Sequence, residues 1–271
     1  MTAPTGIDRA RQVATLVTFV VTIALNSAAN ALPLNGQATG EISDRFRVFV
    51  TPAGYVFAIW GVIYLFQLAF LVHTLRPSRA ADPLLRRLGL LPAIAAVFNA
   101  TWIVAWHWEV FPLTLLLMIG LLVTLIAIYQ RGALGKIAPP RSGVTRAERW
   151  LVQVPFSLYL GWITVATIAN VAAVGNWAGV TTFGIEVPLV AAAVLVVGFL
   201  IAAVVTARTA DIAYAAVIVW AYVGIVVKES AENTPYVPIV AGAAAIAVVA
   251  VLIAAIVRAG MGGERLAWGR T

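Results

Sequence analysis

The sequence has no cysteine and only two histidines, His73 and His107. The missing thiols exclude a disulfide-stabilised secreted domain, a thiolate metal site, a cysteine nucleophile and an iron–sulfur cluster. Two histidines are too few for a metal centre built from imidazole ligands. Charged residues are also scarce, at 11% of the 271 residues, whereas a soluble domain has about 25%.

Apolar residues make up 62% of the chain, and the mean hydropathy is +0.97. A bilayer core about 30 Å thick needs about 20 apolar residues per helix. Eight segments meet this requirement: 12–32, 54–75, 88–106, 110–130, 150–174, 186–206, 212–228 and 235–257. We therefore expect an all-α integral membrane protein, a bundle of eight transmembrane helices with both chain ends on one side.

The positions of the basic residues predict which side that is. Fifteen of the 18 Lys and Arg residues lie in the terminal segments and in the loops on their side, and the other three are Arg45, Arg47 and Lys228. The positive-inside rule then places both termini in the cytoplasm. The same bias accounts for the net charge of +7, so we expect no nucleic-acid partner. Arg outnumbers Lys 16 to 2, which is typical of a GC-rich bacterial genome and hence of a plasma-membrane location.

The first segment has an alternative interpretation. Arg9 and Arg11, a short apolar run and the sequence Ala29-Asn30-Ala31 resemble a signal peptide with its cleavage site. Cleavage would leave seven helices and an external N-terminus, and the charge rule would fit equally well.

Ionisable residues are missing from the middle of the predicted helices. Asp211, Lys228 and Glu186 lie near membrane boundaries. The sequence therefore offers no intramembrane proton relay, which disfavours an ion-coupled transporter. It also has no serine–histidine–acid constellation, so an enzyme would depend on chemistry that its ligand brings.

Aromatic residues, by contrast, recur at helical spacing together with amides. Three stripes each share one helix face: Phe57, Trp60 and Tyr64; Asn99, Trp102 and Trp106; and Tyr159, Trp162 and Asn170. The predicted topology puts them at compatible depths, so they can enclose an aromatic cavity under the external loop of residues 33–53. The alternative is that the stripes serve only helix–helix packing.

These motifs resemble a known family. Residues 51–64, TPAGYVFAIWGVIY, resemble the Pro-Pro-Gly-Trp…Phe…Trp…Tyr start of the second helix in TspO/MBR proteins, the tryptophan-rich sensory proteins related to the mitochondrial translocator protein. Residues 99–102, NATW, are similar to the Asn-x-x-Trp of their third helix. Residues 158–170, LYLGWITVATIAN, are similar to the Pro-Tyr-x-x-Trp…Ala…Asn of their fifth.

The resemblance covers residues 10–176 and implies a five-helix core, commonly dimeric, with a cavity for tetrapyrroles or sterol-like ligands under the first loop. Residues 186–257 would form a three-helix C-terminal membrane extension, and residues 258–271 a cytoplasmic tail. Carried over residue by residue, the ligand-binding side chains would be Phe57, Trp60, Tyr64, Asn99, Trp102, Tyr159, Trp162 and Asn170. Two departures from the family pattern argue against porphyrin specificity: residues 33–53 contain no Trp, and Leu158 replaces a Pro.

We therefore expect a binding or sensory protein that holds a planar hydrophobic ligand between the first, second, third and fifth helices. No resident cofactor is indicated; haem or another porphyrin is a candidate ligand. The expected partners are the lipid bilayer, this small molecule and a second copy in a homodimer. The protein is not expected to be an enzyme, modification of a bound tetrapyrrole being the enzymatic alternative. The alternative function is an uncoupled transporter or permease whose pathway includes the last three helices.

The topology can be tested by labelling single cysteines in this cysteine-free background. A cysteine at Gly40 should react with an impermeant maleimide in intact cells, and a cysteine at Pro140 only after permeabilisation. The reverse pattern would contradict the eight-helix topology. A mature chain that begins at Leu32 would support the signal-peptide interpretation.

Overall fold

The computed structural model describes residues 3–32, 34–46, 48–132, 145–180, 182 and 184–268. Over these residues the regular structure is helical, with no β-strand. Eight long helices coincide with the eight expected segments: α1 (Gly6–Ala31), α3 (Ile59–Leu75, preceded by the short helix η2, Gly54–Ala58), α5 (Leu91–His107), α6 (Phe111–Gly132), α8 (Val154–Trp177), α9 (Val187–Thr209), α10 (Ile212–Ala231) and α11 (Val237–Trp268). The predicted all-α membrane fold is confirmed.

The helix α5 is shorter than the other helical segments when η2 and α3 are counted as one continuous segment of 22 residues. Among the described residues, seven helical segments are long and apolar enough to cross a membrane, and α5 is a shorter apolar helix of 17 residues. At 1.5 Å per residue it is about 25 Å long, at the lower limit for a membrane span. It packs against both α1 and α6, so it belongs to the bundle.

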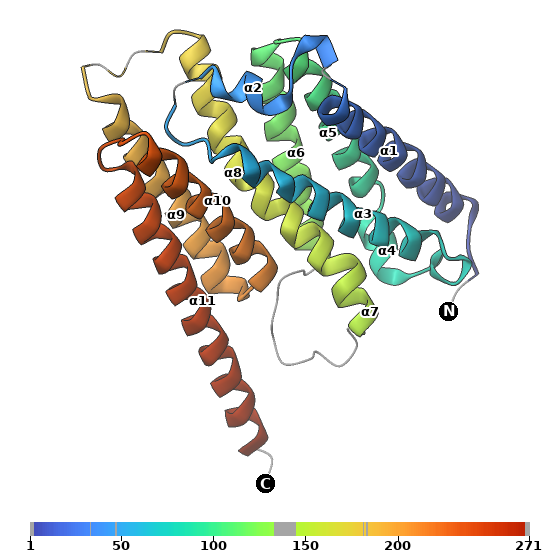
Figure 1. Cartoon of the computed structure of the whole chain (residues 1–271). Helices are drawn as coiled ribbons and strands as arrows, with labels where there is room; N and C mark the ends of the chain where they lie inside the picture. Colours follow the sequence, from blue (N-terminus) through green and yellow to red (C-terminus); the bar gives the residue numbers. More distant parts are fainter. Residues whose placement is uncertain are drawn as a thin grey trace.

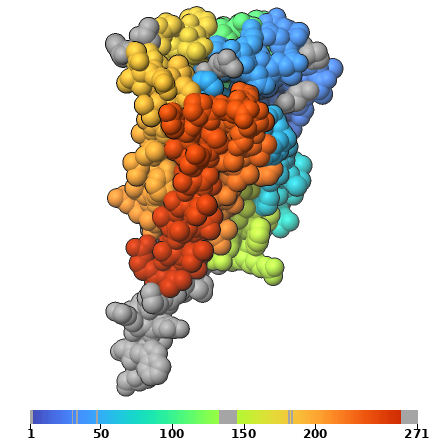
Figure 2. All heavy atoms as spheres, turned by 60° about the vertical axis from the view of Figure 1, so that its left-hand side comes forward, coloured from blue at the N-terminus to red at the C-terminus, as the bar shows by residue number. Residues whose placement is uncertain are grey.

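The short elements gather at the two ends of the bundle (Figure 1). At one end, drawn uppermost, lies the segment between α1 and η2, which we call the covering loop; it includes α2 (Thr39–Asp44). At the opposite end lie α4 (Pro83–Leu88) and α7 (Arg146–Glu148). The first helix α1 begins, and the last helix α11 ends, toward this lower end, as an even number of passes requires. Figure 2 shows the blue covering-loop region at the upper end, above the orange and red helices α10 and α11.

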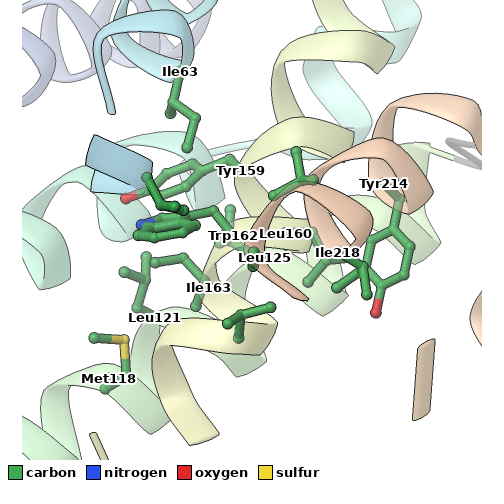
Figure 3. Packing of buried hydrophobic residues seen from close by; sticks show 14 of the residues in the cluster. Ile63, Met118, Leu121, Leu125, Tyr159, Leu160, Trp162, Ile163, Tyr214 and Ile218 are labelled. Carbon is green, nitrogen blue, oxygen red and sulfur yellow. The ribbon is translucent and has the colours of Figure 1, made fainter. Parts of the chain in front are cut away.

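The last three helices are not a detached module. The indole Nε1 of Trp220 in α10 donates to the carbonyl oxygen of Val56 in η2 at 3.1 Å, and the amide of Ala53 donates to the carbonyl oxygen of Gly224 at 3.2 Å. Figure 3 shows Ile218 of α10 in the same buried cluster as residues of α8. The division of the chain after residue 176 stays a prediction, but α10 packs directly on the predicted core.

A tight turn joins α9 to α10. Ala210 ends α9 in the left-handed conformation, with φ of 53°. The carboxylate of Asp211 then accepts a hydrogen bond from the amide of Tyr214 at 3.1 Å and caps α10. This turn points the Asp211 carboxylate into the bundle, where the side chain is 5% exposed.

Close packing of α8 on α10 depends on Gly161. A Cβ atom there would lie 3.0 Å from the carbonyl oxygen of Tyr214 and 3.1 Å from Cβ of Val217. Backbone atoms cannot move aside as a side chain can, so Gly161→Ala should lower the free energy of unfolding by about 1–3 kcal/mol. Thermal unfolding of the purified full-length protein in detergent measures this.

Gly175, on the same helix, is the matched control because a Cβ there meets nothing within 4 Å. Gly175→Ala should leave stability unchanged or raise it by up to about 1 kcal/mol, the helix-propensity gain. Equal effects of the two substitutions would contradict the α8–α10 contact.

Candidate functional site

A small cavity of about 50 Å³ lies under the covering loop. Its walls come from the covering loop, η2, α3, α5 and α8. The lining residues are Thr39, Ser43, Thr51, Pro52, Phe57, Trp60, Trp102, Trp106, Trp162, Val165, Ala166, Ala169, Asn170 and Ala173. None of these is Asp, Glu, Lys, Arg or His, so the cavity wall is built from aromatic, small and uncharged polar side chains.

Aromatic rings at helical spacing form the wall. The ring of Trp162 meets Phe57 and Trp60 edge-on, with centroid distances of 5.7 and 6.0 Å. On the opposite side Trp102 stacks on Trp106 at 5.5 Å with an interplanar angle of 19°. Edge-to-face and offset-stacked pairs are the favoured aromatic geometries, so the rings within each of these two groups stabilise one another as well as enclose the cavity.

Five of the eight predicted ligand-binding residues line this cavity: Phe57, Trp60, Trp102, Trp162 and Asn170. The other three lie next to it. Trp60 stacks on Tyr64 at 5.3 Å and meets Tyr159 edge-on at 6.0 Å, and Tyr159 in turn contacts Asn99. The structure thus brings the three stripes together, and their role in binding a ligand stays a prediction.

A buried hydrogen-bond chain connects three helices beside the cavity. Nδ2 of Asn26 in α1 donates to Oδ1 of Asn99 in α5 at 2.8 Å. Nδ2 of Asn99 donates to the hydroxyl oxygen of Tyr159 in α8 at 2.6 Å. Asn99 is fully buried and Asn26 is 3% exposed. The Asn99 side chain is therefore engaged within the protein, and these hydrogen bonds join α1, α5 and α8 beside the cavity.

The first helix lies elsewhere than expected. The expected ligand position is between the first, second, third and fifth helices, but no described residue of α1 is among those that line the cavity. Instead α1 packs against α5 and α3 and reaches the site only through Asn26. No described residue of α9, α10 or α11 lines the cavity either.

Two indole N–H groups at the cavity have no hydrogen-bond partner in the described structure. They belong to Trp102, 8% exposed, and Trp162, 2% exposed. By contrast, Nε1 of Trp106 donates to the carbonyl oxygen of Thr39 at 3.2 Å. An unsatisfied buried donor costs about 1–3 kcal/mol. A bound molecule with acceptor atoms would remove this cost.

The covering loop is held over the cavity by what we call the Glu109 cluster, namely Gln37, Arg45 and Glu109. Oε1 of Glu109 accepts a hydrogen bond from Nε2 of Gln37 at 2.9 Å and forms an ion pair with Nη2 of Arg45 at 3.0 Å. The hydrogen bond from Gln37 and that from Arg45 lower the pKa of Glu109. The carboxylate therefore stays charged at neutral pH, and the contact is lost only as the pH falls through that lowered pKa.

A second contact ties the covering loop to α10. Nζ of Lys228 lies 2.9 Å from Oδ1 of Asp44 at the end of α2. The loop is therefore anchored both to the corner between α5 and α6 and to the C-terminal helices.

Sequence reasoning missed part of this site. Trp106 was in the third-helix stripe but not among the candidate ligand-binding residues, although its helical spacing from Trp102 was the available signal. Thr39 and Ser43 line the cavity from α2, and no sequence pattern identified them. Asp211 was placed at a membrane boundary without a role, whereas its carboxylate accepts hydrogen bonds from the hydroxyls of Tyr129 and Ser157 at 2.8 and 2.5 Å.

Together, the fold and the cavity define a multi-pass α-helical membrane protein with an aromatic cavity under the covering loop. The chain belongs to the TSPO-like protein family, whose match covers residues 12–257. This confirms the predicted family, and the matched region extends through α9, α10 and most of α11. Comparisons with curated proteins and with solved structures found no match. Among the described residues, no group of three or more His, Asp or Glu side chains could hold a metal ion.

The Glu109 cluster should control access to the cavity. With a single cysteine at Ser43, which lines the cavity from α2, the maleimide labelling rate reports how often the loop opens. Glu109→Ala should raise that rate about twofold to fivefold, which is the change expected when a partly exposed ion pair that holds the loop closed is lost. Glu186→Ala, at an exposed residue before α9, is the control and should have no effect. Equal rates in the two variants would mean that the cluster does not hold the loop.

Proposed function

We propose that this protein is a membrane-embedded binding or sensory protein for a planar hydrophobic ligand, tetrapyrrole-like or sterol-like, taken up in the cavity under the covering loop. The observation that carries the proposal is an aromatic wall with two unpartnered indole N–H groups, those of Trp102 and Trp162. Flat apolar surface on the ligand would pack against the rings. A carbonyl, carboxylate or hydroxyl oxygen at its edge would accept from the indoles.

The cavity must enlarge for such a ligand to enter. Its volume is about 50 Å³, whereas pockets for small organic ligands are usually about 300–1,000 Å³. The covering loop supplies Thr39, Ser43, Thr51 and Pro52 to the lining. Displacement of this loop, resisted by the Glu109 cluster, is therefore the opening step in the proposal.

Binding rather than catalysis is favoured by the chemistry of the wall. General acid–base catalysis needs a side chain that exchanges a proton near neutral pH, and the lining residues include no carboxylate, amine or imidazole. We accordingly assign the protein no reaction of its own, with haem or another porphyrin and sterols as the ligands to test.

The proposed setting is a bacterial plasma membrane, with both termini in the cytoplasm and the covering loop outside. The distribution of basic residues supports this orientation. We also propose that residues 10–176 are the ligand-binding core, because every lining residue lies within them, and that the protein forms a homodimer, as the family resemblance implies.

An uncoupled transporter remains the second candidate. The observation that favours it is the attachment of the covering loop to α10 through Lys228 and Asp44, because a shift of α10 would then move the loop. Ligand flux across proteoliposomes distinguishes the two functions. Flux that saturates and is lost in Lys228→Gln would favour the transporter, and binding without flux would favour the sensor.

Trp162→Ala should weaken ligand binding because the Trp162 ring lines the cavity and packs edge-on against both Phe57 and Trp60. A buried aromatic ring packed on a planar ligand contributes on the order of 1–3 kcal/mol, or about 5- to 150-fold in Kd. The measurement is a titration of the full-length protein in nanodiscs with protoporphyrin, haem and cholesterol. Trp108→Ala is the control, since Trp108 is 53% exposed and outside the cavity.

Trp162→Phe separates packing from hydrogen bonding. It keeps an aromatic ring and removes the N–H donor, so its effect should be smaller for the dimethyl ester of protoporphyrin than for the free acid. Equal losses in Trp162→Ala and Trp108→Ala would indicate non-specific hydrophobic uptake and contradict the proposal.

A further inference from the structure

A second and larger hollow lies at the opposite end of the bundle from the covering loop. It has a volume of about 500 Å³, ten times that of the aromatic cavity. Three elements form it: α3, the start of α8 together with the preceding π-helical segment η4 (Arg149–Gln153), and the start of α10. None of its lining residues belongs to the aromatic cavity, so the two hollows are separate. We call this hollow the lower groove.

Two opposite charges border the lower groove, and neither has an ionic partner among the described residues. The carboxylate of Asp211 is buried, and its hydrogen bonds come from two hydroxyls and one backbone amide. The guanidinium of Arg149 belongs to an exposed residue and makes no hydrogen bond or ion pair within the described structure. A buried carboxylate without a cation is costly in an apolar environment, so the groove lacks a positive group near Asp211 and an anion near Arg149.

Apart from Gln153 and Ser157, the rest of the groove is apolar, and part of it faces outward from the bundle. Val62 is 43% exposed and Ile212 is 54% exposed, and Phe66 and Leu158 complete the apolar side. Trp150, 50% exposed, stands beside Arg149. An exposed tryptophan next to an arginine at a helix end is typical of the membrane–water interface. The groove therefore spans the boundary between lipid headgroups and hydrocarbon.

We propose that the lower groove is a binding site for a lipid whose headgroup carries a phosphate and a primary ammonium, the chemistry of phosphatidylethanolamine. The phosphate pairs with the guanidinium of Arg149, which can donate two parallel hydrogen bonds. The ammonium donates to the carboxylate of Asp211, and the first part of an acyl chain packs on Val62, Phe66 and Ile212. The one cation and one anion of the groove match a zwitterion. An anionic headgroup would leave Asp211 without a counter-charge, and a quaternary ammonium has no proton to donate to it.

Native mass spectrometry of the full-length protein tests this site. The protein is released from detergent in the presence of equal amounts of phosphatidylethanolamine, phosphatidylcholine and phosphatidylglycerol with identical acyl chains. We expect one retained lipid, with phosphatidylethanolamine preferred. Ala216→Trp fills the groove from an exposed position on α10 and should reduce retention at least fivefold. Ala254→Trp, at an exposed alanine on α11 outside the groove, is the matched control and should not.

Charge variants test the headgroup assignment. Arg149→Gln should weaken retention of all three lipids about threefold to fivefold, because each carries a phosphate. Asp211→Asn keeps an acceptor for Ser157 and Tyr129 but should abolish the preference for phosphatidylethanolamine over phosphatidylcholine. Soluble phosphoethanolamine should not displace the lipid, since the acyl chain supplies much of the binding; displacement would mean that the site takes a free phosphate compound.

Equal retention of the three lipids by the unchanged protein would overturn the proposal, as would equal retention in Ala216→Trp and Ala254→Trp. If Asp211→Asn is not monodisperse, the Ala216→Trp and Arg149→Gln comparisons still decide the matter, because neither replaces a buried side chain.

Discussion

Hydrocarbon offers no hydrogen-bond partner, so polar groups within this bundle depend on one another. The chain from Asn26 through Asn99 to Tyr159 meets that requirement and holds α1, α5 and α8 together behind the aromatic wall. Because of the same constraint, the indole N–H groups of Trp102 and Trp162, which have no hydrogen-bond partner in the described structure, would be stabilised by an acceptor on a bound ligand. The protein fixes the wall with its own polar groups and leaves donors at the cavity.

Local sequence patterns were sufficient for the helices and for most of the aromatic site. Each expected span coincides with a helix because apolar length is a local property; the segment expected at 54–75 is η2 followed by α3. The spacing of Asn99 and Trp102 on one face of α5, and of Tyr159 and Trp162 on one face of α8, likewise follows from 3.6 residues per turn. These residues could therefore be assigned to common faces before their neighbours were known.

Contacts between distant segments could not be predicted in this way. The small volume of the cavity depends on how the covering loop packs, and the loop is fixed by Gln37 and Arg45 meeting Glu109 more than 60 residues away. Asp211 was recognised only as a boundary residue, because its burial depends on Tyr129 and Ser157 in other helices. The absence of α1 from the cavity wall has the same origin, since helix order in space is not a local property.

The proposed ligand of the family-type site binds in the upper of the two hollows, under the covering loop, and not in the lower groove. Hydrogen–deuterium exchange of the full-length protein in nanodiscs, with and without saturating protoporphyrin or cholesterol, tests that claim most directly. The account predicts that ligand changes the exchange of residues 34–46 and of the corner between α5 and α6, where the loop and Glu109 meet. Exchange that is unchanged there, or altered only in α9, α10 and α11, would contradict binding under the covering loop.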